Sequence, residues 1–211
     1  KKSNRSARDV FIIAVTKTHS QTAIQSAIKN GINIIGESRV VEAAEKFLQL
    51  PNRNEIETHL IGHLQSNKAR KAVETFDVIQ SVDTLKLGKR INHFAKELNK
   101  TQRIMIQINT GADPTKYGFS AEESIRSALQ LNNLYNVKLE GVMMIAPFFL
   151  DEIRLREIFA KTREIKQTIQ SEIPTCKALS MGMTADYVIA IEEGATHVRI
   201  GTALFGERII K

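Results

Sequence analysis

The sequence predicts an α/β fold, a (β/α)8 TIM barrel, formed as a single domain over residues 1–211. Short apolar runs rich in Ile and Val recur along the whole chain, and amphipathic stretches with a period of about 3.6 residues separate them. Glycine and polar residues follow the ends of most of these runs. In a barrel, those positions line the carboxyl-terminal face of the strands, where active sites are built.

Eight apolar runs are expected to form the strands: residues 10–15, 32–35, 58–61, 78–82, 103–108, 139–145, 178–180 and 198–200. The clearest helical segments between them are residues 21–29, 40–50, 85–98, 121–131 and 152–169. Continuous apolar runs are typical of parallel strands that are covered on both faces. A doubly wound open sheet is the rival fold. We disfavour it because Thr16-Lys17-Thr18-His19 follows the first run, where a glycine-rich dinucleotide fingerprint would stand.

The formal net charge of +7 favours anionic ligands. The basic residues are dispersed and are not interleaved with aromatic residues, so we expect no nucleic-acid partner. No run approaches the roughly 18 apolar residues of a membrane span. Cys176 is the single cysteine, which excludes an internal disulfide and fits a reducing compartment. We therefore expect a cytoplasmic protein without a membrane segment.

Lys17 comes directly after the first apolar run. Partial burial there disfavours the charged amine, lowers its pKa and makes it a usable nucleophile toward an aldehyde. A lysine that extends from the barrel rim into water is the equally weighted alternative on position alone.

The segments that follow the last two strands, residues 179–186 and 198–206, are rich in small and hydroxyl residues. Their hydroxyl groups and backbone amides fall where barrel enzymes frequently bind phosphate. Each segment could also consist of turn and helix-cap residues. Together they predict a phosphorylated ligand across the barrel mouth from Lys17. His63 lies on the same rim without a metal-ligand partner at the usual spacing, and it could orient a ligand or bond within its own loop.

These segments make the resemblance specific. The chain resembles the pyridoxal phosphate homeostasis protein family, once named for genes co-transcribed with proline synthesis. The matching segments are Ala-Val-Thr-Lys-Thr at 14–18, Gly-Glu-Ser-Arg-Val at 36–40, residues 59–68, Gln-Ile-Asn-Thr at 107–110 with Lys116 and Gly118, and the stretch 179–206. They extend over nearly the whole chain in the family's order.

The resemblance implies a barrel similar to the N-terminal domain of bacterial alanine racemase, carrying pyridoxal 5′-phosphate (PLP). Lys17 then matches the family's Schiff-base lysine, and Ser180, Gly201 and Thr202 match residues that contact the phosphate. Arg199 matches an arginine on the pyridine side of the cofactor. A fixed cation there disfavours protonation of the ring nitrogen and makes the ring a poorer electron sink.

Two departures from the family pattern stand out. Ser38 replaces the usual asparagine of a Gly-Glu-Asn-Arg motif, so a contact of that amide with the cofactor ring is lost or bridged by water. The family also carries a helix of about 20 residues (about 30 Å) ahead of the first strand. Only nine residues precede Val10, so we expect that helix to be missing or truncated.

Racemisation through PLP needs an acid or base on each face of the substrate carbon. In alanine racemase the second group is a tyrosine of another domain, for which this chain has no room; Tyr117, Tyr135 and Tyr187 are not evident replacements. We therefore expect a non-catalytic, monomeric carrier that supplies PLP to apo-enzymes. A weak amino-acid racemase and a Schiff-base aldolase acting on a sugar phosphate are the alternatives.

Overall fold

A computed structural model describes residue 3 and residues 5–51, 53–148 and 150–206. In this part of the chain, eight parallel strands close into a barrel in sequence order, because β1 pairs with β8 as well as with β2. The strands are β1 (Phe11–Val15), β2 (Ile34–Glu37), β3 (Glu57–Leu60), β4 (Val78–Val82), β5 (Gln102–Ile108), β6 (Val137–Met144), β7 (Ala178–Met183) and β8 (His197–Ile200). The predicted barrel is confirmed, and the open sheet is excluded.

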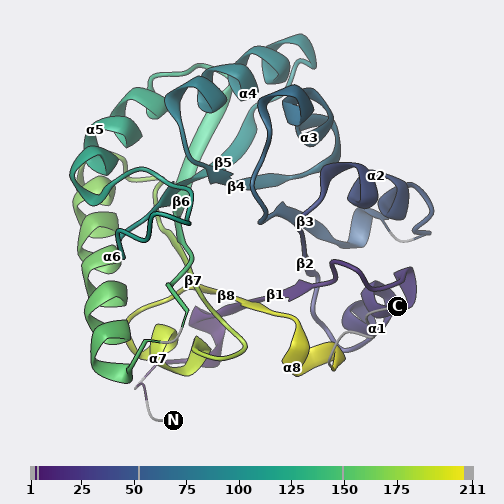
Figure 1. The fold of residues 1–211 in the computed structure, drawn as a ribbon. Coiled ribbons are helices and arrows are strands. Elements are labelled where there is room, and N and C mark those ends of the chain that lie inside the picture. Colours follow the sequence, from purple (N-terminus) through teal and green to yellow (C-terminus); the bar gives the residue numbers. More distant parts are fainter. Residues whose placement is uncertain (1–2, 4, 52, 149, 207–211) are drawn as a thin grey trace.

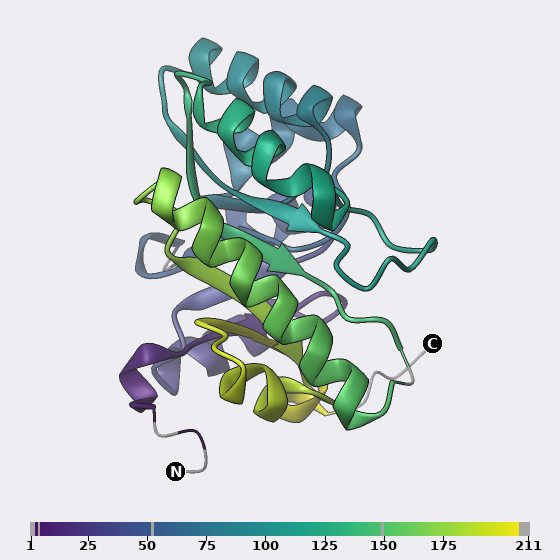
Figure 2. The ribbon, with the colours of Figure 1, turned by 90° about the vertical axis from the view of Figure 1, so that its left-hand side faces the viewer.

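Helices surround the strands (Figure 1). They are α1 (Gln21–Lys29), α2 (Val40–Leu48), α3 (Ala69–Thr75), α4 (Leu85–Glu97), α5 (Ala121–Asn132), α6 (Glu152–Glu172), α7 (Tyr187–Glu192) and α8 (Thr202–Phe205). Short 3-10 helices occur at Ala7–Asp9, Arg53–Glu55 and Ser66–Lys68. The strand arrows in Figure 2 point to the side that faces the viewer in Figure 1, so Figure 1 shows the carboxyl ends of the strands. No helix in the described ranges combines the length and apolar character that crossing a membrane requires.

Two strands run further at their carboxyl ends than the sequence predicts, and a glycine lies in each extension. β2 continues through Gly36 to Glu37, and a Cβ at Gly36 would lie 2.7 Å from the Ile13 side chain, so only glycine lets these strands approach so closely. β7 continues to Met183 through Gly182, whose φ of +92° belongs to the left-handed region. The β7–β8 register shifts at this point, as expected of a bulge.

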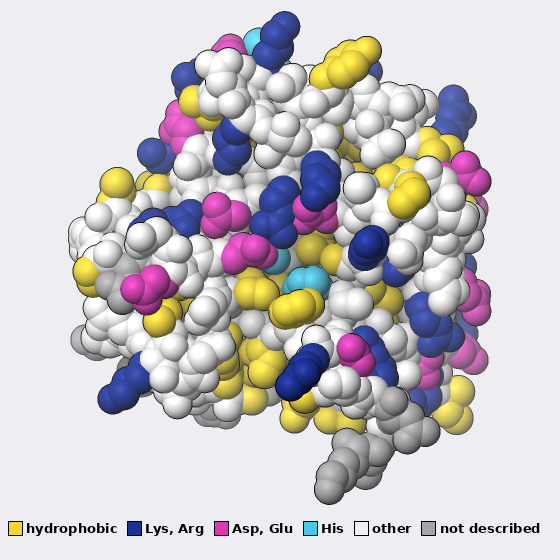
Figure 3. Space-filling view, turned by 180° about the vertical axis from the view of Figure 1, so that it is seen from behind, with side chains coloured by type: hydrophobic (Ala, Val, Ile, Leu, Met, Phe, Trp, Pro, Cys, Tyr) yellow, Lys and Arg dark blue, Asp and Glu magenta, His cyan; other side chains and the backbone are white. Residues whose placement is uncertain are grey.

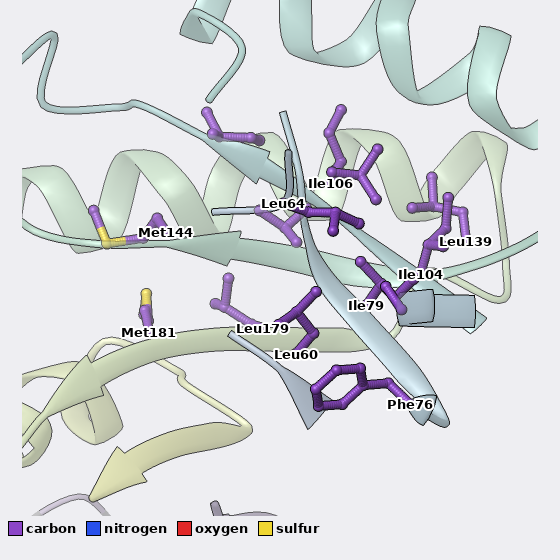
Figure 4. Packing of buried hydrophobic residues seen from close by; sticks show 14 of the residues in the cluster. Leu60, Leu64, Phe76, Ile79, Ile104, Ile106, Leu139, Met144, Leu179 and Met181 are labelled. Atoms are coloured by element: carbon purple, nitrogen blue, oxygen red, sulfur yellow. The ribbon is translucent and has the colours of Figure 1, made fainter. Parts of the chain in front are cut away.

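The main hydrophobic core lies between the strands and the helices. Figure 4 shows part of it, with Leu60, Ile79, Ile104, Leu139 and Leu179 on the successive strands β3 to β7. A smaller cluster of Val78, Met105 and Met143 occupies the other face of the sheet, inside the barrel. Because successive side chains of a strand alternate between faces, the residues beside this inner cluster also point inward. Several of them are polar and buried: His59, Gln80, Gln107, Ser180 and Arg199.

Candidate functional site

A cavity of about 260 Å³ opens at the carboxyl ends of β1, β2, β7 and β8. This volume is near the lower end of the range for small-molecule sites, which begins at about 300 Å³. Its wall consists of Val15, Lys17, His19, Ser38, Ile61, Ile145, Met183, Thr184, Ala185, Arg199, Gly201 and Thr202. The structure thus brings together Lys17, Ser38, Arg199, Gly201 and Thr202 from the six predicted site residues.

Lys17 is partly buried and lies two residues beyond the end of β1. The next residue, Thr18, has a φ of +67°, a conformation that a β-branched residue adopts only when its surroundings enforce it. The amide of Thr18 donates to Glu42 Oε1 at 3.0 Å, and the amide of His19 donates to the carbonyl of Thr16 at 3.0 Å. Both flanks of Lys17 are therefore held in a tight turn.

A buried ion pair between Lys46 and Glu37 holds the backbone of this turn in place. Lys46 Nζ lies 2.7 Å from Glu37 Oε1 and donates to the carbonyl of Thr16 at 3.0 Å. The Thr16 hydroxyl donates to the same Glu37 oxygen at 2.7 Å. The Glu37 side chain is fully buried and that of Lys46 is 9% exposed, so the pair lies in a low-dielectric setting where it fixes geometry strongly. Glu37, Lys46 and Glu42 were not among the predicted site residues. The Glu-Ser-Arg motif at 37–39 was the available signal.

The opposite wall of the cavity comes from the turns after β7 and β8. The amide of Asp186 donates to the carbonyl of Met183 at 3.0 Å, and the amide of Met183 donates back to the Asp186 carboxylate. This closed turn presents Thr184 to the cavity. The amide of Ala203 donates to Thr184 Oγ1 at 3.4 Å, which links the two turns. Gly201 and Thr202 lie beside them, and the three residues offer hydroxyl and amide donors to an anion.

Arg199 supplies the positive charge at the base of the cavity. Its side chain is 4% exposed, and burial lowers the pKa of the guanidinium to about 10, an effect that the Asp186 charge opposes. It therefore remains protonated at neutral pH. Its Nη1 donates to Ser180 Oγ at 2.9 Å and its Nη2 to the Met144 carbonyl at 2.8 Å. Both acceptors are uncharged oxygens, so neither hydrogen bond neutralises the positive charge of Arg199 as a carboxylate would.

Ser180 does not line the cavity. It points into the barrel, is fully buried, and its hydroxyl donates to Gln80 Oε1 at 2.7 Å while accepting from Arg199. The cavity wall therefore contains Thr184 from the β7 side, and not Ser180. The sequence signal for Thr184 was its place in the same segment, two residues beyond Gly182.

Ser38 is half-buried at the end of β2, and a Cβ on Gly62 would lie 2.3 Å from its carbonyl oxygen. Because residue 62 is glycine, the loop after β3 can pack directly against the backbone of Ser38, which lies in the cavity wall. His63 and Tyr117 lie outside the cavity wall. His63 Nδ1 is 3.0 Å from Asp83 Oδ2. The His63 ring stacks on the Tyr117 ring, with 3.7 Å between the ring centroids. His63 thus bonds to Asp83, just after β4, rather than within its own loop, and it does not line the cavity.

A larger hollow, of about 540 Å³, lies at the opposite end of the barrel. Its wall consists of Asp9, Phe11, Lys138, Glu140, Pro174, Thr175, Lys177, Ala178, Thr196 and His197. Figure 3 shows this face, with charged and histidine side chains gathered near its centre. Many of these charges pair with one another: Glu140 contacts Lys138 at 2.9 Å and Arg103 at 2.7 Å. Among the described residues, no group of three or more His, Cys, Asp or Glu could hold a metal ion.

Residues 2–209 match the family model of the alanine racemase N-terminal domain. The pyridoxal phosphate homeostasis protein of Synechocystis sp. is 41% identical over 201 residues, which cover 95% of this chain and 92% of that protein. The protein of that name from Escherichia coli is 33% identical over 97% of this chain and 88% of its own length. The chain belongs to this family.

Solved structures agree with this membership. PipY of Synechococcus elongatus with PLP bound is 38% identical, with a TM-score of 0.87 and coverage of 97% of this chain and 96% of that chain. Alanine racemase of Clostridium difficile has a TM-score of 0.81 at 17% identity, and the match covers 98% of this chain but 55% of the racemase. That second likeness concerns the fold alone.

Proposed function

We propose that this protein holds pyridoxal 5′-phosphate reversibly, through a covalent bond to Lys17, and supplies it to apo-enzymes. The observation that carries the proposal is the shared cavity. It places the Lys17 amine, the donors of Thr184, Gly201 and Thr202, and the Arg199 guanidinium around one hollow. Relatives bear the name pyridoxal phosphate homeostasis protein, and the similar PipY structure contains PLP. We infer a cytoplasmic monomer whose contacts with apo-enzymes are transient.

The residues present fit this group. When bound, PLP supplies an electrophilic aldehyde and a pyridine ring that can withdraw electrons. Lys17 would hold the cofactor through its amine, which can condense with an aldehyde with loss of water and be released again by water. Hydroxyl and amide donors at Thr184, Gly201 and Thr202 suit a phosphate dianion. Arg199 is suited to keep the pyridine nitrogen unprotonated, because a neighbouring cation disfavours a second positive charge.

The cavity offers few groups that could move protons for turnover. In the described part of the wall, the titratable side chains are Lys17, His19 and Arg199. The His19 ring packs against Phe205, with 5.3 Å between ring centroids. An imidazole in the wall is the one feature that favours weak racemase activity, so His19→Phe belongs in any test of that alternative.

Absorbance spectroscopy of purified protein mixed with PLP tests the proposal. We expect a yellow protein whose absorbance band disappears in Lys17→Ala. Lys29→Ala is the matched control, because Lys29 is an exposed lysine at the end of α1, and it should retain the band. A wild-type protein that takes up no PLP would overturn the proposal.

Deuterium exchange separates the carrier from the enzyme. We expect exchange at Cα of alanine in heavy water to be far slower than about 1 per second, the lower end of common enzyme turnover. The loaded protein should also activate an apo-enzyme that depends on PLP. Exchange at enzymatic rates that His19→Phe abolishes would establish the racemase alternative instead.

A further inference from the structure

A line of hydrogen-bonded polar side chains crosses the inside of the barrel below the cavity. It begins with Arg199 on β8, which donates to Ser180 Oγ on β7 at 2.9 Å. The Ser180 hydroxyl donates to Gln80 Oε1 on β4 at 2.7 Å. Gln80 Nε2 lies 2.6 Å from His59 Nδ1 on β3, and His59 Nε2 lies 2.5 Å from Glu57 Oε1. The line thus joins residues from four strands.

Because most members of this line are buried, the loss of any one of its hydrogen bonds is energetically costly. Ser180, Gln80 and His59 have no exposed surface, and Arg199 is 4% exposed. A buried donor or acceptor that loses its partner pays the full desolvation penalty of that group. Glu57, by contrast, is partly exposed at the start of β3 and reaches the opposite end of the barrel. The line therefore runs from the cavity wall to the amino-terminal face.

The donors all point in one direction. The Gln80 amide nitrogen can only donate, so His59 Nδ1 accepts and His59 Nε2 carries the proton that bonds to Glu57. The opposite amide orientation would leave Ser180 accepting from both neighbours and would require a second proton on His59. Glu57 is the ionised terminus, since the hydrogen bond from His59 above all lowers the pKa of its carboxyl to about 2. A cation thus stands at one end and an anion at the other.

We propose that Ser180, Gln80 and His59 are positioning residues for Arg199. The hydrogen-bond line orients the guanidinium in the cavity wall and connects it to the Glu57 carboxylate on the far face of the barrel. The inference rests on the proposed function insofar as the group that Arg199 faces is the pyridine ring of PLP. A line of aligned hydrogen bonds polarises its members, so a change at Gln80 reaches Arg199 without touching the cavity.

Gln80→Leu is the central variant. It removes the oxygen that accepts from Ser180 and the amide that donates to His59, while the side-chain volume stays similar. Gln102→Leu is the matched control. Gln102 is also fully buried, on the neighbouring strand β5, and its Nε2 donates to the backbone carbonyls of Phe76, Asp77 and Arg103. Both variants lose a buried amide, and only the first interrupts the line.

Nitrogen NMR of the ligand-free protein supplies a readout that needs no cofactor. We expect the wild type to show a neutral His59 with its proton on Nε2. The guanidinium signals of Arg199 should shift in Gln80→Leu and in Ser180→Ala, but not in Gln102→Leu. Arg199 signals that respond equally to Gln80→Leu and Gln102→Leu would overturn the proposal. If Gln80→Leu does not fold, the comparison of Ser180→Ala with Gln102→Leu decides in its place.

PLP titration then connects the line to the cavity. We expect Gln80→Leu to bind PLP about 10-fold more weakly and with a displaced absorbance maximum, whereas Gln102→Leu binds as the wild type does. Wild-type protein without PLP uptake would refute the proposed function, while the NMR comparison would still decide the hydrogen-bond line. Normal PLP binding by Gln80→Leu, with an unchanged spectrum, would refute the positioning role alone.

Discussion

At the amino-terminal end of the barrel, Arg103 lies between two carboxylates, 2.8 Å from Glu57 and 2.7 Å from Glu140. At the carboxyl-terminal end, Arg199 donates to a hydroxyl and to a backbone carbonyl. The two arginines point into the same barrel from β5 and β8, yet the first is neutralised by its neighbours and the second retains its charge for the cavity. The hollow beside the neutralised arginine is the larger one, about 540 Å³ against about 260 Å³. A buried arginine that is not hydrogen-bonded to a carboxylate therefore identifies the functional site better than the volume of the cavity does.

The ion pairs of the two ends also differ in burial. Glu37 and Lys46, below the Lys17 turn, have side chains that are 0% and 9% exposed. Lys138 and Glu140, at the amino-terminal end, are 51% and 16% exposed. A buried pair is strongly destabilising to break, whereas an exposed pair contributes little. This contrast orders the effects expected from substitutions at the two ends.

Lys46→Met should have the largest effect. It leaves the Glu37 carboxylate buried without its cation and should lower the free energy of unfolding by about 3–5 kcal/mol. Chemical denaturation measures this. The double variant Lys46→Met with Glu37→Gln should regain much of the loss, and a loss below about 1 kcal/mol for the single variant would remove the contrast with the exposed pairs.

The combined variant Thr184→Val and Thr202→Val tests the phosphate side of the cavity. Loss of two hydroxyl donors to a charged group should weaken PLP binding by about 2–4 kcal/mol, or roughly 30- to 1000-fold, with little change in stability. Titration with PLP and with pyridoxal, which lacks the phosphate, measures the effect. The variant should weaken PLP binding much more than pyridoxal binding, and equal losses for both would argue against phosphate contacts here.

His197→Phe tests the amino-terminal end through pH. Burial lowers the pKa of His197 from 6.5 to about 4. The unfolded chain binds this proton near pH 6.5 and the folded chain near pH 4, so stability falls as the pH drops between these values. Denaturation curves should show a loss of about 3 kcal/mol across this window that His197→Phe reduces. An unchanged pH dependence in the variant would contradict the depressed pKa.

Lys138→Ala should have the smallest effect. Its partner Glu140 keeps Arg103, and the Lys138 side chain is half-exposed, so we expect a change in unfolding free energy of at most about 1 kcal/mol. PLP affinity should remain that of the wild type. A marked loss of PLP binding would instead mean that the larger hollow takes part in holding the cofactor.

The barrel and the positions of its mouth could be predicted because both follow from local patterns. Apolar runs identify the strands, and the residues after them, such as Lys17 and Gly201, must lie at the carboxyl ends once the sheet is parallel. The bounds of helices α3, α7 and α8 could not be predicted because they have seven, six and four residues, too few to repeat a helical period clearly.

The support of the site could not be predicted, because it depends on contacts between distant residues. Ser180 and Gln80 are 100 positions apart, and Lys46 reaches back 30 positions to the Thr16 carbonyl. Strand register decides whether a hydroxyl such as that of Ser180 faces the cavity or the barrel interior. The segment 179–186 alone does not fix that register, so it does not reveal that Thr184 lines the cavity while Ser180 is buried inside the barrel.

Borohydride reduction followed by peptide mass mapping identifies the lysine that holds PLP. Protein incubated with PLP is reduced, digested, and searched for the mass of the reduced cofactor on each lysine. We expect the adduct on the peptide that contains Lys17, in proportion to the yellow absorbance before reduction. An adduct found mainly on other lysines, with Lys17 unmodified, would contradict this expectation.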